Sequence, residues 1–199
     1  MKPDNYLIID FEATCCDQGS IPREHMEIIE IGAVIADPHS LEITSEFQSF
    51  IRPVRHPKLS PFCKSLTSIQ QADVDSAPLF HDAALAFKKW LYQYPNFIFC
   101  SWGDYDYKQL EQDCRFNKVP NPVSAQHINL KKLIAEKQNL MRKPGLGEAI
   151  RLSGLTFEGQ HHRGIDDARN IARLLPYIYG TEIFKSKDNC RPRTSAQNK

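Results

Sequence analysis

Residues 6–11, Tyr-Leu-Ile-Ile-Asp-Phe, form a short run of apolar and aromatic side chains that a single acid interrupts. A run of this length with apolar residues at successive positions is typical of a strand that is buried on both faces. A strand buried on both faces needs neighbouring strands at its sides and helices above and below it. The run therefore predicts the middle strand of a covered sheet.

The segments that follow add further strands and then helices. Residues 28–36 and 42–51 are separated by Asp-Pro-His-Ser at 37–40, which predicts a hairpin of two strands. Residues 77–94 carry apolar side chains at helical spacing, and residues 96–100 have the pattern of another strand. Further helical patterns cover residues 105–116, 130–138, 146–153 and 166–179. This order predicts an α/β fold in which a mixed sheet, antiparallel in its first strands, is flanked by helices.

A chain of 199 residues is near the common size of one globular domain. We expect residues 1–184 to form that domain. Residues 185–199 are basic and have no apolar periodicity, which predicts a disordered tail. The formal net charge of +1 provides no global field that would attract a polyanion, so any nucleic-acid binding must be local.

Two further features bear on where the protein acts. The six cysteines form no C-x-x-C pair, which favours reduced thiols. The apolar run at residues 6–9 is too short for a signal peptide or a membrane span. We therefore expect a cytoplasmic location and no membrane partner.

Asp10 and Glu12 flank Phe11 on the predicted middle strand. Because side chains alternate along a strand, both carboxylates would point to the same face. Two acids beside an apolar strand are costly unless a cation or a hydrogen-bond network compensates them. A strand ending at Ile9, followed by two solvated acids, is the alternative for this pair alone; the rest of the chain favours a site.

A third acid follows the predicted strand at residues 96–100. The chain passes through Gly103 into a helix, and Asp106 lies in phase with the apolar face of that helix. Asp104 lies in phase with Lys108 and Glu111 instead. We predict that Asp106 faces inward, whereas Asp104 occupies an N-cap or solvent position.

The same test identifies a fourth acid at residues 161–167, His-His-Arg-Gly-Ile-Asp-Asp. Asp167 lies in phase with the apolar face of the following helix, whereas Asp166 lies in phase with polar residues. His162 is the partner of Asp167, and His161 is expected to be a neighbour. A surface histidine and a zinc site made by the two histidines with a cysteine are the alternatives. No cysteine has the spacing of a zinc motif, and carboxylate-rich sets suit magnesium or manganese better.

These segments resemble a known family. Residues 10–15 (DFEATC), 102–106 (WGDYD) and 162–172 (HRGIDDARNIA) are similar to the three motifs of the DEDD superfamily of 3′-to-5′ exonucleases, in its histidine-containing, DnaQ-like branch. Within that branch, residues 11–15 and 60–69 resemble the Eri-like exoribonucleases, which trim RNA 3′ ends. The resemblance covers residues 6 to about 179. It implies a ribonuclease H-like fold with a mixed five-stranded sheet, and an exonuclease domain over residues 1–184.

The resemblance also implies roles for particular residues. Carried over by position, Asp10, Glu12, Asp106 and Asp167 would bind two Mg²⁺ (or Mn²⁺) ions, and His162 would be the general base, with Glu12 also serving the reaction. The expected activity releases nucleoside 5′-monophosphates from single-stranded RNA or RNA 3′ overhangs. Single-stranded nucleic acid, with RNA preferred, is therefore the expected partner; protein partners are not specified.

The terminal nucleotide needs a binding pocket, and the sequence offers candidates for its walls. The backbone at Phe11, Ala13 and Thr14 could read the 2′-hydroxyl of the sugar. Phe11, Trp102 and Tyr105 are candidates for base stacking, although a strand phenylalanine is more often part of the core.

Other functions use the same residues. A 3′-to-5′ exodeoxyribonuclease or a nuclease for short oligonucleotides would need the same acids and His162. A non-catalytic RNA-binding module is a third alternative. Four clustered acids argue against it, because their negative charge repels a polyanion unless cations are bound.

Overall fold

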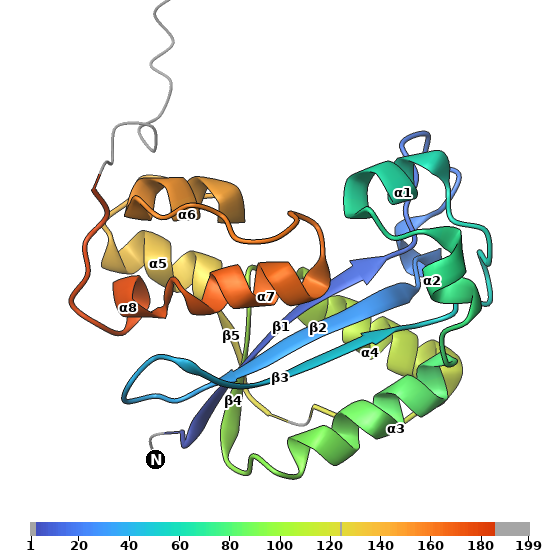
Figure 1. The fold of residues 1–199 in the computed structure, drawn as a ribbon, viewed down its shortest axis with the longest axis horizontal. Coiled ribbons are helices and arrows are strands. Elements are labelled where there is room, and N and C mark those ends of the chain that lie inside the picture. Colours follow the sequence, from blue (N-terminus) through green and yellow to red (C-terminus); the bar gives the residue numbers. More distant parts are fainter. Residues whose placement is uncertain (1–2, 124, 186–199) are drawn as a thin grey trace, which may run out of the picture.

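Strand β1 (Asn5–Ala13) is the middle strand of a five-stranded sheet with the order β3-β2-β1-β4-β5 (Figure 1). The structure is a computed structural model that describes residues 3–123 and 125–185. Strands β2 (Ile28–Ala36) and β3 (Ile43–Phe50) extend the sheet on one side of β1 as an antiparallel hairpin. Strands β4 (Phe97–Ser101) and β5 (His127–Asn129) run parallel to β1 on its other side. The predicted mixed sheet and its middle strand are confirmed.

Helices cover both faces of the sheet. One face is covered by α5 (Leu130–Lys137), α6 (Leu146–Ser153), α7 (Gly164–Ala172) and α8 (Leu175–Ile178) (Figure 1). The other face is covered by α3 (Phe80–Leu91) and α4 (Tyr105–Asn117). The short helices α1 (Pro61–Thr67) and α2 (Gln71–Asp75), with the 3-10 turn η1 (Arg23–His25), lie toward the end of β1 at Ala13.

The side chains of β1 divide between two core clusters. Ile8 packs with residues of α5, α6, α7 and α8, whereas Leu7, Ile9 and Phe11 pack with residues of α3 and α4. Leu7, Ile8 and Ile9 are completely buried. This alternation places Asp10, the next residue after Ile9, on the same side as Ile8 and therefore beneath α7.

The helices differ from the sequence pattern in three places. The helix predicted over residues 166–179 is interrupted between α7 and α8, where Pro176 lies in the first turn of α8. Proline has no N–H and crowds the preceding turn, which explains the interruption. The helix predicted over residues 77–94 is shorter at both ends. The short elements α1, α2 and β5 were not predicted, because too few residues show a periodic pattern.

The predicted tail and the cysteines are only partly within the described residues. Residues 186–199 of the predicted tail lie outside the described residues; the backbone N–H of Lys185 donates to the Leu152 carbonyl at 2.9 Å. Five cysteines in the described part of the chain are free thiols, namely Cys15, Cys16, Cys63, Cys100 and Cys114. The sixth, Cys190, lies outside that part.

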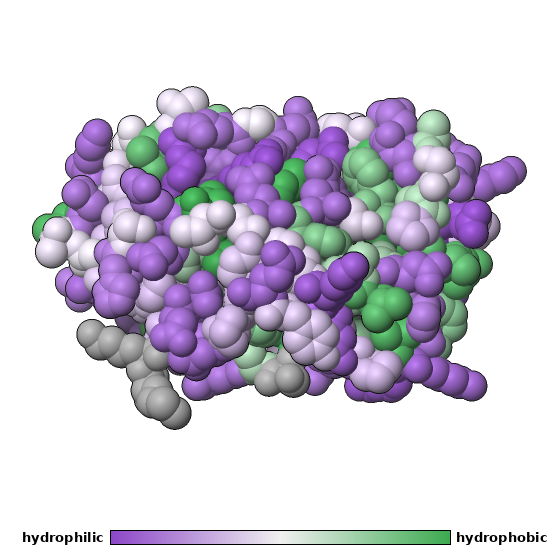
Figure 2. Space-filling model, turned by 60° about the horizontal axis from the view of Figure 1, so that its bottom comes forward, coloured by the Kyte–Doolittle hydropathy of each residue, from purple (hydrophilic) through white to green (hydrophobic). Residues whose placement is uncertain are grey.

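None of the helices within residues 3–123 and 125–185 has the length and apolar character needed to cross a bilayer. The face drawn in Figure 2 is mainly hydrophilic, with small groups of hydrophobic residues between the polar ones. The expected cytoplasmic location stays a prediction.

Candidate active site

A cavity of about 840 Å³ lies where the second half of β1 meets α4 and α7. The acids that the sequence singled out all line it, together with both histidines of the loop before α7. These residues are Asp10, Glu12, Asp106, Asp167, His161 and His162. The structure thus brings the predicted carboxylates and His162 into one place.

Asp106 is fixed to β1 through the backbone. The side chain is 4% exposed, and its Oδ1 accepts a 2.9 Å hydrogen bond from the N–H of Phe11. Asp104 is exposed at the N-cap position of α4, where its carboxylate accepts a hydrogen bond from Nδ2 of Asn129 at 2.9 Å and does not cap the helix. Helical phase therefore predicted correctly that Asp106 is buried and Asp104 exposed. Asp104 is the N-cap residue of α4, as expected, but its side chain makes no capping hydrogen bond to the helix.

Two glycines allow α7 to lie directly on the sheet. A Cβ atom added to Gly32 in β2 would lie 2.0 Å from the carbonyl carbon of Gly164. A Cβ atom added to Gly164 would lie 2.7 Å from the carbonyl oxygen of Asp10. Only residues without a side chain permit this approach, and it sets Asp167, one turn further along α7, beside the acids of β1.

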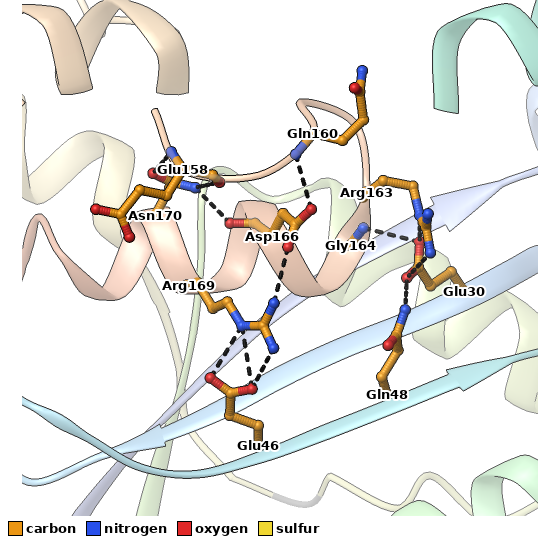
Figure 3. Close-up of polar contacts among 10 residues, drawn as sticks. All are labelled: Glu30, Glu46, Gln48, Glu158, Gln160, Arg163, Gly164, Asp166, Arg169 and Asn170. Atoms are coloured by element: carbon orange, nitrogen blue, oxygen red, sulfur yellow. Dashed lines mark hydrogen bonds and ion pairs between the residues drawn. The ribbon is translucent and has the colours of Figure 1, made fainter. Parts of the chain in front are cut away.

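A buried ion pair fixes the beginning of α7 (Figure 3). Glu30 of β2 has a fully buried side chain, and it accepts hydrogen bonds from Arg163 at 3.1 Å and from the N–H of Gly164 at 3.1 Å. Gln48 of β3 donates to the same carboxylate at 2.6 Å. The first turn of α7 is therefore tied to two strands by charge-assisted hydrogen bonds.

Asp166 faces away from the cavity, as its helical phase predicted. Figure 3 shows its carboxylate between the N–H of Gln160, at 2.9 Å, and the guanidinium of Arg169, at 3.0 Å. Asp167 is 4% exposed and points the other way, into the cavity. The two adjacent aspartates thus serve different purposes: Asp166 orders the loop, and Asp167 belongs to the site.

His162 has a left-handed backbone, with φ of 64°. In this conformation its N–H donates to Oδ2 of Asp167 at 3.2 Å, so backbone and acid hold each other in place. Burial lowers the pKa of His162, and the adjacent His161 lowers it further. The imidazole of His162 is therefore neutral at pH 7 and can accept a proton.

The carboxylates repel one another strongly. Oxygen atoms of Asp10, Glu12 and Asp167 lie within 4.8 Å of one another. Burial, followed by the neighbouring acids, raises the pKa of Glu12 to about 9 and that of Asp10 well above its usual range. Burial raises the pKa of Asp167 to about 7 and that of Asp106 to about 6, although the Phe11 N–H partly offsets the shift of Asp106. Such a cluster releases its protons readily only when cations are bound.

The donor set suits hard divalent cations. Only oxygen ligands meet at the three-carboxylate cluster, and Oδ1 of Asp167 is buried without a hydrogen-bond partner among the described residues. A buried polar atom without a partner is unfavourable, and a cation would satisfy it. The residues present therefore fit magnesium or manganese.

The predicted substrate-binding residues are only partly brought to the cavity. Ala13, Trp102 and Tyr105 line it, and the indole N–H of Trp102 donates to the Pro144 carbonyl at 3.3 Å. Phe11 also lines the cavity, but the residue is only 4% exposed and its side chain belongs to the core cluster on the α3 and α4 side of the sheet, as its core alternative predicted.

Thr14 is buried and does not line the cavity; its hydroxyl instead accepts a hydrogen bond from the N–H of Glu27 at 3.0 Å. The sequence analysis placed both Ala13 and Thr14 at the site, but neighbouring side chains at the end of a strand point to opposite sides, so that Ala13 lines the cavity and Thr14 does not.

Three residues near the acids were missed in the sequence. Glu30 is the antiparallel partner of Glu12 in the sheet and adds to the shift of its pKa; an acid between Ile29 and Ile31 was a signal that could have revealed it. Arg23 and Lys131 also line the cavity. The Arg23 guanidinium lies 4.2 Å from the centre of the Tyr105 ring. Arg23 is the first residue of the 3-10 turn η1, which is too short for a periodic pattern, and nothing in its sequence context indicates this position.

The sequence and the fold match known proteins. A sequence model of the RNase T family, described as exonuclease, matches residues 7–175. The chain is 36% identical over 190 residues to ERI1 exoribonuclease 3 of Homo sapiens, covering 90% of this chain and 55% of that protein. It is 35% identical over 194 residues to ERI1 exoribonuclease 2 of Homo sapiens, covering 86% of this chain and 28% of that protein.

A solved structure shares the fold. The nuclease domain of 3′hExo, described as a DEDDh family member bound to rAMP, superimposes with a TM-score of 0.81 at 31% identity, over 93% of this chain and 98% of that domain. The chain thus spans about half or less of the length of the two human proteins, and nearly all of a nuclease domain.

Proposed function

Because the chain belongs to the RNase T family of exonucleases, we propose that it removes nucleotides one at a time from the 3′ ends of RNA. The products are nucleoside 5′-monophosphates, and the substrates are single-stranded RNA and RNA 3′ overhangs. One observation carries this proposal: four carboxylates and a neutral histidine, contributed by β1, α4, α7 and the loop before α7, converge on one cavity.

The preference for RNA is supported by the relatives. Both human proteins compared above are named exoribonucleases, and the nuclease domain of similar fold was solved with a ribonucleotide, rAMP. Two positively charged side chains line the cavity, those of Arg23 and Lys131. Because the net charge of the whole chain is only +1, they would provide the local positive charge that attracts the phosphates of the substrate.

Asp10, Glu12, Asp106 and Asp167 would hold two divalent cations, Mg²⁺ or Mn²⁺. Bound cations of this kind activate water, neutralise the phosphate and stabilise the leaving oxygen in phosphodiester hydrolysis. The residues of the chain supply the rest. The N–H of Phe11 holds the Asp106 carboxylate in position, and the N–H of His162 holds that of Asp167.

His162 would accept the proton of the attacking water. Its ring is half-buried at the cavity wall, and its lowered pKa keeps the imidazole neutral at pH 7. Trp102 and Tyr105 would stack on bases of the substrate, and the backbone at Ala13 would lie near the terminal sugar.

The decisive experiment follows the direction of cleavage. RNA and matched DNA, labelled at the 3′ or the 5′ end, are incubated with the full chain and Mg²⁺, Mn²⁺ or a chelator. We expect stepwise shortening of RNA from its 3′ end, only with metal. Asp106→Asn should abolish it, because the amide keeps an acceptor for the Phe11 N–H but loses the charge. Asp104→Asn, at the exposed neighbouring aspartate, is the matched control and should retain cleavage.

The alternatives give different results. Faster loss of DNA would identify an exodeoxyribonuclease, and activity limited to the shortest RNAs would identify an oligonucleotide nuclease. Binding of RNA without cleavage of either polymer would contradict the proposal and support a non-catalytic RNA-binding module.

A further inference from the structure

His161 brings a second imidazole to the edge of the carboxylate cluster. Its Nδ1 atom lies 3.8 Å from Oδ2 of Asp167, and its ring centre lies 4.2 Å from that of His162. One ligand atom from each of these three residues lies within 4.8 Å of the other two. Two imidazoles and one carboxylate therefore form a second possible ligand set, which shares only Asp167 with the all-carboxylate cluster.

Two atoms of this set lack a partner. Nδ1 of His161 and Oδ1 of Asp167 are both buried, and neither has a hydrogen bond within the described part of the chain. A buried polar atom without a partner is unfavourable, and a bound ligand would satisfy it. Both atoms belong to the candidate set, and Asp167 itself is 4% exposed. These two buried atoms without hydrogen bonds therefore point to a ligand between His161 and Asp167.

The ring of His161 is also held in the orientation that such a site needs. It stacks on Phe157 with the ring centres 4.9 Å apart and an angle of 16° between the planes. Its Nε2 atom faces Gly147, where an added Cβ would lie 3.4 Å away. With one edge of the ring against α6, the opposite edge presents Nδ1 toward Asp167.

Nitrogen ligands change which metal the set prefers. Imidazole favours zinc, whereas magnesium prefers oxygen ligands alone. Zinc bonds to histidine nitrogen and carboxylate oxygen are about 2.0–2.2 Å long, so two ligand atoms of a tetrahedral site lie about 3.3–3.6 Å apart. The 3.8 Å between His161 and Asp167 is slightly longer than this spacing, and small side-chain rotations would close the difference and bring in His162.

We propose that His161, His162 and Asp167 form a zinc site that overlaps the active site and inhibits it. Zinc bound there would engage the Asp167 carboxylate, which would then be unavailable as a ligand in the all-carboxylate cluster. It would also occupy the nitrogen lone pair with which His162 would accept a proton. Zinc binding by these residues stands apart from the activity, whereas the inhibitory consequence rests on the proposed nuclease function.

The test measures binding and inhibition separately. Zn²⁺ is titrated calorimetrically into the full chain in excess Mg²⁺, for the wild type, His161→Phe and His81→Phe. The phenylalanine at 161 keeps the ring stack on Phe157 but has no ligand atom. His81 forms an exposed pair with Asp82 at 3.0 Å and is the matched control. We expect zinc affinity to fall about tenfold or more in His161→Phe, by analogy with the loss of residues that support metal ligands, and to be unchanged in His81→Phe.

Inhibition of RNA cleavage by Zn²⁺, expressed relative to the zinc-free rate of each variant, should require correspondingly more zinc in His161→Phe. Equal zinc affinity in the wild type and in a folded His161→Phe variant would overturn the site. Zinc binding that depends on His161 but leaves cleavage unaffected would overturn the inhibitory role. If the protein cleaves no RNA at all, the calorimetric comparison still decides the site.

Discussion

Gly32 of β2 and Gly164 of α7 meet backbone to backbone, so closely that a methyl group on Gly32 would lie 2.0 Å from the carbonyl carbon of Gly164. The contact joins the sheet to the helix that carries Asp167. Gly32 is also the antiparallel partner of Asp10. The separation of helix and sheet, and with it the geometry of the carboxylate cluster, therefore depends on a glycine in the middle of a buried strand.

Gly32→Ala should destabilise the protein severely. The nearest neighbours of the new methyl group are backbone atoms, which cannot rotate away, so we expect a loss of about 3 kcal/mol or more in the free energy of unfolding. For a chain of this size the loss corresponds to a fall in Tm of about 10 °C. Gly147→Ala is the control, because its methyl group would have only ordinary contacts with His161. The Tm values of the two variants should differ widely in thermal unfolding. Similar Tm values would show that the contact between Gly32 and Gly164 can accept a methyl group.

Stability without metal should fall as the pH rises. Folding raises the pKa of Asp106 to about 6, of Asp167 to about 7 and of Glu12 to about 9. The folded protein thus holds protons that the unfolded chain releases, and this stabilisation is complete at low pH and lost as the pH passes each folded pKa. In a chelator, Tm should decrease between about pH 5 and about pH 9.

Two comparisons identify the carboxylates as the cause. Added Mg²⁺ should flatten the dependence of Tm on pH, because a cation replaces the protons. Glu12→Gln should also reduce the slope, since it removes an acid whose pKa is raised to about 9. A Tm that stays constant or rises with pH in the chelator would contradict this account.

Arg163→Met should be costly because it leaves the Glu30 carboxylate buried without its guanidinium partner. The Glu30 side chain is fully buried and that of Arg163 is 23% exposed, so we expect a loss of about 2–4 kcal/mol in the free energy of unfolding. Lys132→Met is the control: the Lys132–Glu136 pair is exposed, and its loss should cost less than about 1 kcal/mol. Urea unfolding of both variants measures the difference, and equal losses would contradict the distinction.

Trp102→Ala should weaken RNA binding. A base that stacks on an aromatic ring contributes about 1–3 kcal/mol, so Kd should rise about five- to hundredfold. Fluorescence anisotropy with labelled RNA, in an Asp106→Asn background that prevents cleavage, gives this constant. Tyr92→Ala removes an aromatic ring that is 74% exposed and does not line the cavity, and should leave Kd unchanged. Unchanged affinity in a folded Trp102→Ala variant would exclude stacking by Trp102.

Local periodicity explains which parts of the site could be predicted. The phase of a helix separated Asp106 from Asp104 and Asp167 from Asp166, because the inward face of each helix is repeated every three or four residues. The alternation of a strand placed Asp10 and Glu12 on one side. The family resemblance then supplied their roles, which no periodicity contains.

Contacts between distant segments could not be predicted in this way. The Glu30–Arg163 pair and the approach of Gly32 to Gly164 join β2 to a helix late in the chain. The left-handed backbone of His162 depends on its hydrogen bond to Asp167 and on the packing of α7. Each of these features exists only in the folded molecule, and a single sequence shows none of them as a pattern.

The order of the acids along the chain has a consequence during synthesis. Asp10 and Glu12 are made early, whereas Asp167 follows only after nearly all of the sheet and its helices. A nascent chain that has not yet reached α7 would therefore carry three of its four acids and have no means of completing the cluster. The proposed cleavage would begin only once α7 has been made and has packed on β1, so the active site would be completed late in the synthesis of this domain.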